Sequence, residues 1–344
     1  MSRYTVGIEA HSGERLYVLR DSQSGAYARI WPAFGNNCLA ATLVTASGRT
    51  VDAILEPSDL DQVRQQPSWW GIPLLFPWPG RIPRGAYEFQ GQRYQLPVMD
   101  MNGNAGHGFV KNRPWRVEDT EGRDDCASLH CSFSSADHPE TLDGYPFPYR
   151  VVTTYRLDEG GLLLHTLVSN EGDGPMPFGF GPHPYFRIPI GGDTKREECL
   201  VTVPAARRWN LRRVGALAPD ERLTWADVTE PVAGTHDLRQ PRPLGDSNYD
   251  GGFTDLEARD GWIECSVADP RAGLELVMQA TANFGTVVVY TPPGRPGICF
   301  EPWTCPPNAF NLAARGVEPS GLIVLAPGQE WSGVMRVSLR PLES

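Results

Sequence analysis

The sequence lacks the features that mark secreted, membrane and nucleic-acid-binding proteins. Residues 1–20 contain no apolar stretch typical of a signal peptide, and no run approaches the ~18 apolar residues of a membrane-spanning helix. Acidic residues outnumber basic ones by 41 to 31, and the formal net charge of −10 disfavours binding to nucleic acid or to an anionic membrane surface. We therefore expect a cytoplasmic protein with no nucleic-acid partner and no membrane partner.

Paired cysteines are missing as well. The seven cysteines are an odd number, and none of them belongs to a C-x-x-C pair. This distribution argues against a disulfide framework and against a structural zinc site. We expect the cysteines to be mostly buried free thiols in a reducing compartment.

Helical periodicity is scarce, whereas turn-forming residues are abundant. The 36 glycines and 32 prolines make up about a fifth of the 344 residues, against ~12% in an average protein. The best helix candidate is Ser58–Gln66, with Ser58 as its N-cap. Elsewhere, short runs alternate between two faces, and in Tyr149–Leu157 every second residue falls on the face that we expect to be buried.

These alternating runs predict the fold class. Strands are predicted at Leu16–Asp21, Ala26–Trp31, Cys38–Thr45, Thr50–Leu55, Ala86–Phe89, Arg93–Leu96, Trp115–Thr120, Ala127–Phe133, Tyr149–Leu157, Leu162–Ser169, Trp262–Ala268, Leu274–Ala280, Val287–Thr291, Ile298–Phe300, Leu322–Leu325 and Trp331–Leu339. No fixed-period repeat or low-complexity linker interrupts them. We predict one all-β domain over residues 1–344, a large antiparallel β-sandwich with long loops that carry the functional site.

Two segments in the first third of the chain combine polar side chains with glycine or proline. Gly71–Ile82 holds three prolines, and it either presents Trp78 and Arg81 to a ligand or leaves Arg81 in solvent. Asn102–Phe109 surrounds His107 with glycines, which let a ligand approach closely or simply form a turn. Neither segment matches a phosphate-binding loop or a known nucleophile motif.

Two later segments supply candidates for proton transfer. His183 lies between two prolines and among aromatic residues, which suits a general acid or base as well as a packed core histidine. Glu301 ends an apolar run, where a carboxylate is costly to bury unless it is paired. One histidine and one glutamate, without metal-ligand spacing, indicate metal-free proton transfer on an uncharged polar substrate, and the tryptophans suit stacking on the apolar face of a sugar ring.

The order and content of these segments resemble the aldose 1-epimerase (galactose mutarotase-like) family from about Gly71 to Asn311. The most specific matches are HPYF at His183–Phe186 and EPWTCPPNAFN at Glu301–Asn311. The pair His107-Gly108, followed by Trp115, is similar to a further family segment, and Tyr249–Phe253 resembles the family's YDxxF element. Two positions depart from the pattern: the family's Asn-Arg pair is Gly80-Arg81, and HPYF is followed by Arg187-Ile188 instead of Asn-Leu.

The resemblance implies an isomerase that interconverts the α and β anomers of a free aldohexose without metal or cofactor. It implies that Glu301 takes the proton of the C1 hydroxyl while His183 protonates the ring oxygen. The open-chain aldehyde then rotates about C1–C2 and closes with both roles reversed. The implied sugar-binding residues are Trp78, Arg81, His107, Asp250 and Trp303. We expect Glu301, with an ordinary pKa of ~4.3, to be a ready base and its charge to raise the pKa of His183.

Two other functions remain open at the level of the sequence. A hexose-6-phosphate 1-epimerase of the same superfamily would use Lys111 and Arg113, with Arg81 or Arg84, to bind the phosphate. A noncatalytic sugar-binding protein would keep the fold and the cleft without the reaction. The sequence does not decide between monomer and homodimer, and it does not identify the preferred aldose.

Overall fold

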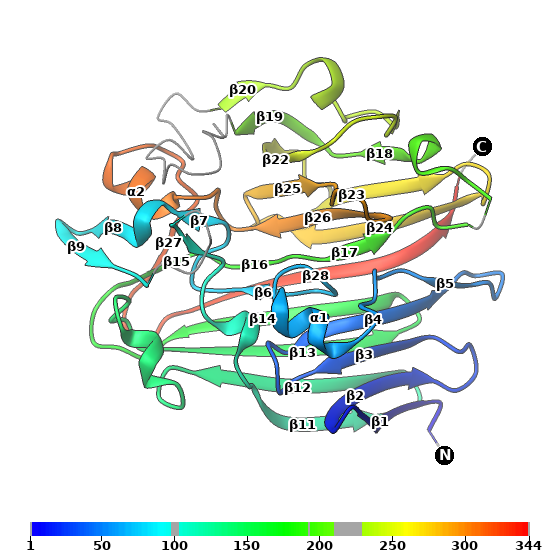
Figure 1. Ribbon diagram of the computed structural model, residues 1–344, viewed down its shortest axis with the longest axis horizontal. Coiled ribbons are helices and arrows are strands. Elements are labelled where there is room, and N and C mark those ends of the chain that lie inside the picture. The colour runs from blue at the N-terminus through cyan, green and yellow to red at the C-terminus, as the bar shows by residue number, and fades with distance from the viewer. Residues whose placement is uncertain (1, 98–102, 192, 210–228, 343–344) are drawn as a thin grey trace.

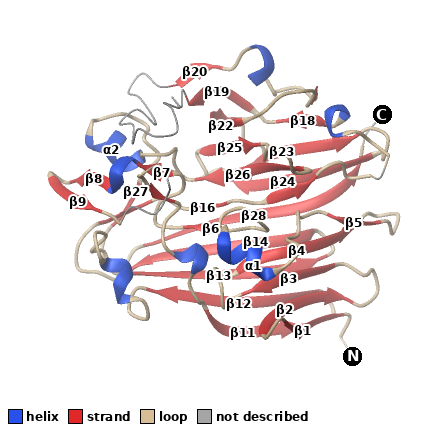
Figure 2. Ribbon diagram, viewed as in Figure 1, coloured by secondary structure: helices blue, strands red, loops and turns tan. Residues whose placement is uncertain are grey.

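The computed structural model describes residues 2–97, 103–191, 193–209 and 229–342, and almost all of its regular structure is β-strand (Figures 1 and 2). One layer is a nine-stranded antiparallel sheet. Its strands, in spatial order, are β11 (Arg116–Gly122), β12 (Cys126–Ser134), β13 (Tyr149–Asp158), β14 (Gly161–Asn170), β28 (Glu330–Pro341), β24 (Leu274–Thr281), β23 (Trp262–Asp269), β18 (Leu200–Thr202) and β21 (Arg242–Pro243). In β13, every second side chain from Tyr149 to Leu157 is buried, which confirms the predicted alternation.

The second layer consists of two smaller sheets that lie over the large one (Figure 1). The five-stranded sheet contains β1 (Tyr4–His11), β2 (Glu14–Asp21), β3 (Tyr27–Trp31), β4 (Asn37–Val44) and β5 (Thr50–Asp52). The six-stranded sheet has the order β17 (Tyr185–Arg187), β26 (Gly297–Trp303), β25 (Thr286–Tyr290), β22 (Asp250–Leu256), β19 (Ala205–Trp209) and β20 (Thr229–Pro231). Apolar side chains from both layers form one continuous core between them, as in other sandwiches.

Short strand pairs and helical turns connect the layers. The pairs are β6 (Leu74–Leu75) with β16 (Gly181–Pro182), β7 (Arg81–Ile82) with β10 (Ala105–Gly106), β8 (Ala86–Phe89) with β9 (Gln92–Gln95), and β15 (Met176–Phe178) with β27 (Ile323–Leu325). The 3₁₀ turns are Pro83–Gly85, Val110–Asn112, Pro139–Leu142, Arg196–Glu198 and Gly234–His236. Two of these pairs, β6 with β16 and β7 with β10, position the candidate site.

Within the described ranges, α-helix is confined to α1 (Leu60–Gln65) and α2 (Ala309–Ala314). The predicted helix at Ser58–Gln66 is therefore present but shorter. Its N-cap is Asp59 and not Ser58, because the Asp59 carboxylate accepts the backbone N–H of Gln62 at 2.9 Å. The helix α2 and the edge strand β1 were not predicted: α2 has only six residues, and the side chains of β1 are largely exposed.

Two further expectations from composition can be compared with the structure. All seven cysteines are buried and unpaired, as the absence of paired spacing predicted. Within the part of the chain that the structure describes, no helix has both the length and the apolar character needed to cross a bilayer.

Candidate active site

The candidate site lies on the face of the six-stranded sheet that points away from the main core. In β26, Ile298 and Phe300 belong to that core, whereas Cys299, Glu301 and Trp303 point to the opposite face. This division follows from the two-residue period of a strand. The apolar run around Glu301 is thus a strand buried on both sides, which is why the sequence shows no polar alternation there.

Strand pairing brings the two predicted catalytic residues together. Tyr185 of β17 lies opposite Cys299 of β26, and this register places His183, just before β17, beside Glu301. The Nε2 atom of His183 lies 3.3 Å from Oε2 of Glu301. His183 is 6% exposed and Glu301 is 1% exposed, so this polar pair is almost completely removed from bulk water.

The outer face of the sheet is the floor of a cavity of about 160 Å³. Ligand pockets usually have ~300–1,000 Å³, so this one has room for little more than a single small ring. The lining residues are Ser68, Trp69, Gly80, Arg81, His107, His183, Tyr185, Asp250, Val288, Tyr290, Glu301, Trp303 and Pro307. The cavity therefore gathers residues from segments that are far apart in the sequence.

Six of the seven predicted site residues line this cavity, namely Arg81, His107, His183, Asp250, Glu301 and Trp303. The seventh residue, Trp78, does not line the cavity, which corrects the expectation for this residue. Its side chain is 1% exposed in the main core, its indole N–H donates to the carbonyl of Ala105 at 3.3 Å, and its ring packs edge-on against Phe109. The proline-rich segment around Trp78 has no regular period, so the sequence pattern could not indicate which way the ring points.

The pairing of β7 with β10 places Arg81 opposite Gly106 and so brings it next to His107. Gly80 and His107 then bind each other twice: the His107 N–H donates to the Gly80 carbonyl at 2.7 Å, and the Gly80 N–H donates to His107 Nδ1 at 3.3 Å. Burial and the Arg81 guanidinium lower the pKa of His107 well below its ordinary value. The ring is therefore neutral, and its remaining hydrogen is on Nε2.

The same segment contains one departure from the family pattern, Gly80 in place of asparagine. Gly80 has φ +71°, and a Cβ atom there would lie 2.9 Å from Cγ of Pro307. An asparagine in this position would collide with the proline ring in addition to adopting a strained backbone. Gly80 and Pro307 thus form a matched pair in this chain.

The pKa shifts of His183 and Glu301, the predicted catalytic pair, differ from the expectation. Burial lowers the pKa of His183 to about 3, with Arg295 and Arg81 adding in the same direction, and burial raises the pKa of Glu301 well above its usual range. The expected rise in the His183 pKa is corrected because burial disfavours the charged form of both partners. At neutral pH the pair then holds one proton, which resides mainly on Glu301.

Tyr185 is a residue that the sequence analysis missed. Its ring stacks on that of His183, with centroids 4.6 Å apart. The hydroxyl donates to the Ser68 carbonyl at 2.9 Å, and its oxygen lies 3.3 Å from His183 Nε2. Because the only hydroxyl hydrogen is used on Ser68, the tyrosine oxygen can accept a hydrogen from Nε2 once the ring has gained the proton of Glu301 there. The available signal was the HPYF motif itself, in which the tyrosine follows the histidine by two residues.

Trp69, one of the cavity-lining residues, packs against an arginine that lies outside the lining. Trp69 is 44% exposed and lines the opening. The Arg295 guanidinium lies over the rings of Trp69, Trp70 and Tyr185, at 5.1, 4.6 and 5.1 Å from their centroids. It also donates to the Trp69 carbonyl at 2.7 Å. These contacts hold Trp69 in place, so its exposed face is available for stacking.

Two of the cations suggested for a phosphate, Lys111 and Arg113, do not line the cavity. Lys111 Nζ donates to the carbonyls of Gly106 and Gly108 at 3.0 and 2.8 Å, behind the His107 loop, and burial lowers its pKa to about 7. Arg113 binds Glu140 at 2.9 Å and the Phe109 carbonyl at 2.7 Å. Among the cavity-lining residues that the structure describes, Arg81 is the only lysine or arginine.

Three donor atoms in the site can hold a metal ion. His183, Cys299 and Glu301 each offer one ligand atom, and these atoms lie within 4.8 Å of one another. All three side chains are buried. The sequence shows no metal-ligand spacing here because Cys299 and Glu301 come from β26 and His183 comes from the segment before β17, more than a hundred residues earlier.

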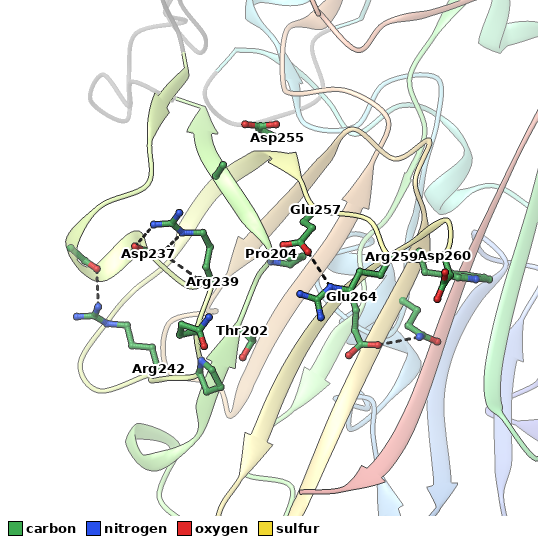
Figure 3. A pocket seen from close by; sticks show the side chains of 16 residues that line it. Thr202, Pro204, Asp237, Arg239, Arg242, Asp255, Glu257, Arg259, Asp260 and Glu264 are labelled. Carbon is green, nitrogen blue, oxygen red and sulfur yellow. Dashed lines mark hydrogen bonds and ion pairs between the residues drawn. The ribbon is translucent and has the colours of Figure 1, made fainter. Parts of the chain in front are cut away.

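A much larger groove of about 1390 Å³ lies between the edge of the six-stranded sheet and β23 (Figure 3). Four of its charged side chains form two ion pairs, Arg239 with Asp237 at 2.7 Å and Arg259 with Glu257 at 3.0 Å. Such mutually satisfied, exposed pairs are ordinary surface features. None of the predicted site residues lines this groove.

Comparisons with known proteins agree with this fold. A galactose mutarotase-like protein from Clostridium acetobutylicum superposes with a TM-score of 0.86 at 22% identity, over 98% of this chain and 99% of its own. The galactose 1-epimerase of Lactobacillus acidophilus gives a TM-score of 0.73 at 18% identity, over 100% of both chains. These likenesses define the class as galactose mutarotase-like β-sandwiches.

Sequence comparisons give the family. A profile described as aldose 1-epimerase matches residues 39–338, which include the whole cavity, and the chain belongs to this family. Galactose mutarotase of Rattus norvegicus is 26% identical over 230 residues, 67% of this chain and 61% of that protein. The uncharacterized protein YihR of Escherichia coli (strain K12) is 28% identical over 240 residues, 69% of this chain and 71% of that protein.

Proposed function

We propose that the protein is a mutarotase that interconverts the α and β anomers of a free aldohexose. The observation that carries this proposal is the contact of 3.3 Å between His183 Nε2 and Glu301 Oε2 inside a cavity with room for one ring. A histidine and a carboxyl group that share one proton supply both the acid and the base of hemiacetal opening. Family membership and the mutarotase relatives support the same reaction.

In the proposed reaction, the shared proton first moves from Glu301 to His183. The Glu301 carboxylate then takes the C1 hydroxyl proton, the bond between C1 and the ring oxygen breaks, and His183 Nε2–H protonates that oxygen. The open-chain aldehyde leaves Glu301 protonated and His183 neutral, which are the protonation states that burial favours. Rotation about C1–C2 and closure with reversed roles give the other anomer and restore both groups.

The remaining cavity residues hold the sugar. Arg81 and Asp250 provide charged hydrogen-bonding groups, and neutral His107 provides an Nε2–H donor. The aromatic faces of Trp69 and Trp303 suit the apolar side of a pyranose. Since Arg81 is the only described lysine or arginine in the lining, a free aldose fits this set better than a sugar phosphate.

Polarimetry of freshly dissolved α-glucose, α-galactose and α-glucose 6-phosphate tests the proposal. We expect the purified protein to accelerate mutarotation of a free aldose more than that of glucose 6-phosphate, and to keep its activity in EDTA. His183→Asn, which cannot deliver the proton, should lose ~10²-fold or more of kcat. Saturable sugar binding without any acceleration would support the noncatalytic alternative, and preference for the phosphate would support the epimerase of phosphorylated hexoses.

A further inference from the structure

The two catalytic candidates have a third neighbour that the proposed reaction does not use. Cys299 precedes Glu301 by two residues on β26, so both side chains leave the strand on the same face. Its sulfur, His183 and Glu301 present three donor atoms within 4.8 Å. Oε2 of Glu301 and Nδ1 of His183 are buried without a hydrogen-bond partner among the described residues, so the pair is not saturated by its surroundings.

We propose that His183, Cys299 and Glu301 form a binding site for a thiophilic divalent cation of the Zn²⁺ type, and that occupation of this site blocks the proton-transfer pair. Imidazole, thiolate and carboxylate are the ligands that zinc takes in proteins. Two such atoms ~2.0–2.2 Å from a tetrahedral zinc lie ~3.3–3.5 Å apart, and the 3.3 Å between Nε2 and Oε2 falls in that range. The sulfur lies within 4.8 Å of both atoms, so it needs to approach by at most roughly 1 Å to complete the set.

Charge balance favours the ion once the thiol and the carboxyl group have lost their protons. The two negative charges of Cys299 and Glu301 equal the charge of Zn²⁺, so the buried unit is neutral, whereas each anion alone is costly to bury. The guanidinium groups of Arg81 and Arg295 act against a cation, and Asp250 in the cavity wall acts for it. Removing the thiolate should therefore weaken binding strongly.

A bound ion would prevent the site from catalysing proton transfer. The fourth position of a tetrahedral ion faces the cavity, where water or a sugar hydroxyl can occupy it. His183 Nε2 and Glu301 Oε2 would be used as ligands, so neither could exchange a proton with a sugar. The ion binding itself does not depend on the proposed reaction, because the three donors are present whatever the substrate.

Zinc titration of the full chain, in a phosphine reductant and with a chromophoric chelator as competitor, tests the site directly. We expect one Zn²⁺ per chain and at least a tenfold loss of affinity in Cys299→Ala. Cys305→Ala is the matched control, since Cys305 is equally buried but lies outside the donor set. Equal zinc affinity in Cys299→Ala and the wild type, or no stoichiometric binding by the wild type, would overturn the proposal.

Cobalt(II) provides a readout that needs no variant. We expect the wild-type protein to show a thiolate-to-cobalt charge-transfer band, and absence of that band at full occupancy would contradict ligation by Cys299. In polarimetry, Zn²⁺ should abolish whatever mutarotation the protein has, and EDTA should restore it. Zinc binding in a protein without mutarotase activity would refute the proposed function and leave the metal site standing; full activity with zinc bound at the triad would refute the blocking role.

Discussion

The small cavity and the large groove differ in how their polar groups are satisfied. The groove of about 1390 Å³ is lined by charged side chains, several of which form exposed ion pairs, as Arg239 does with Asp237 (Figure 3). The cavity of about 160 Å³ holds a buried histidine and a buried glutamate, and two of their atoms, His183 Nδ1 and Glu301 Oε2, lack hydrogen-bond partners among the described residues. Burying unsatisfied polar groups costs stability, and such a cost is expected where function requires it. The comparison therefore favours the cavity, and not the groove, as the functional site.

The largest expected effect concerns the carboxyl group. Glu301→Gln keeps the shape of the side chain but removes the base, so we expect kcat for aldose mutarotation to fall by ~10²-fold or more with an unchanged circular dichroism spectrum. Glu264→Gln is the matched control, because Glu264 lines the groove and binds Gln279 at 3.1 Å. Near-wild-type mutarotation in Glu301→Gln, or an equal loss in Glu264→Gln, would break the comparison between the two hollows.

The pH dependence of kcat/KM tests the shared proton. Activity needs one proton on the pair: a second proton binds His183 only near its lowered pKa of about 3, and the last proton leaves Glu301 only above its raised pKa. We expect an acid limb far below the ordinary pKa of histidine and an alkaline limb well above that of glutamate. Each rate is corrected for the buffer-catalysed reaction at the same pH. A narrow bell between ~4.3 and ~6.5 would instead indicate two groups with ordinary pKa values.

The next largest effects are expected for substitutions of residues that we propose to contact the sugar. Arg81→Ala and Asp250→Ala each remove a charged hydrogen-bonding group from the cavity wall. Such bonds contribute ~1.5–3 kcal/mol, so we expect kcat/KM to fall by ~10- to 150-fold in each variant. Arg259→Ala, in the groove, is the control for removal of an arginine. Unchanged kcat/KM in both cavity variants would discard the proposed sugar contacts.

The strand pattern and the motifs predicted much of this arrangement. The alternation of β13 and the positions of most strands could be predicted from the sequence, because each strand has one face toward a common core. Glu301 stood out because an acidic residue interrupts an apolar run. The directions of the pKa shifts of His183 and Glu301 could not be predicted from the sequence, because they depend on how completely the segments around Trp69 and His107 cover the two side chains. The approach of Cys299 to His183 likewise depends on the register of β17 with β26, which no local pattern specifies.

A positioning role for Tyr185 predicts an intermediate effect. Tyr185→Phe keeps the ring that stacks on His183 but removes the oxygen that accepts Nε2–H. We expect a several-fold fall in kcat, a smaller change in KM, and a shifted acid limb, because the protonated histidine loses the oxygen that accepts its Nε2–H. Tyr87→Phe provides a control outside the cavity lining, because the Tyr87 hydroxyl donates to the Gly144 carbonyl. A loss of stability without any change in the pH profile would assign Tyr185 a purely structural role.

The smallest effect is expected for a substitution in the groove, and it tests whether the groove is an ordinary surface feature. Arg239 and Asp237 are 53% and 35% exposed at their side chains, and exposed pairs of this kind contribute little because water and salt screen them. Arg239→Ala should therefore leave kcat/KM within about twofold of the wild type, since the residue lines only the groove. A tenfold loss of kcat/KM with an unchanged melting temperature would mean that the groove takes part in handling the substrate. In that case, ion pairing in the groove would not be evidence against a functional role. The buried atoms without hydrogen-bond partners in the cavity would then not be enough to identify the site.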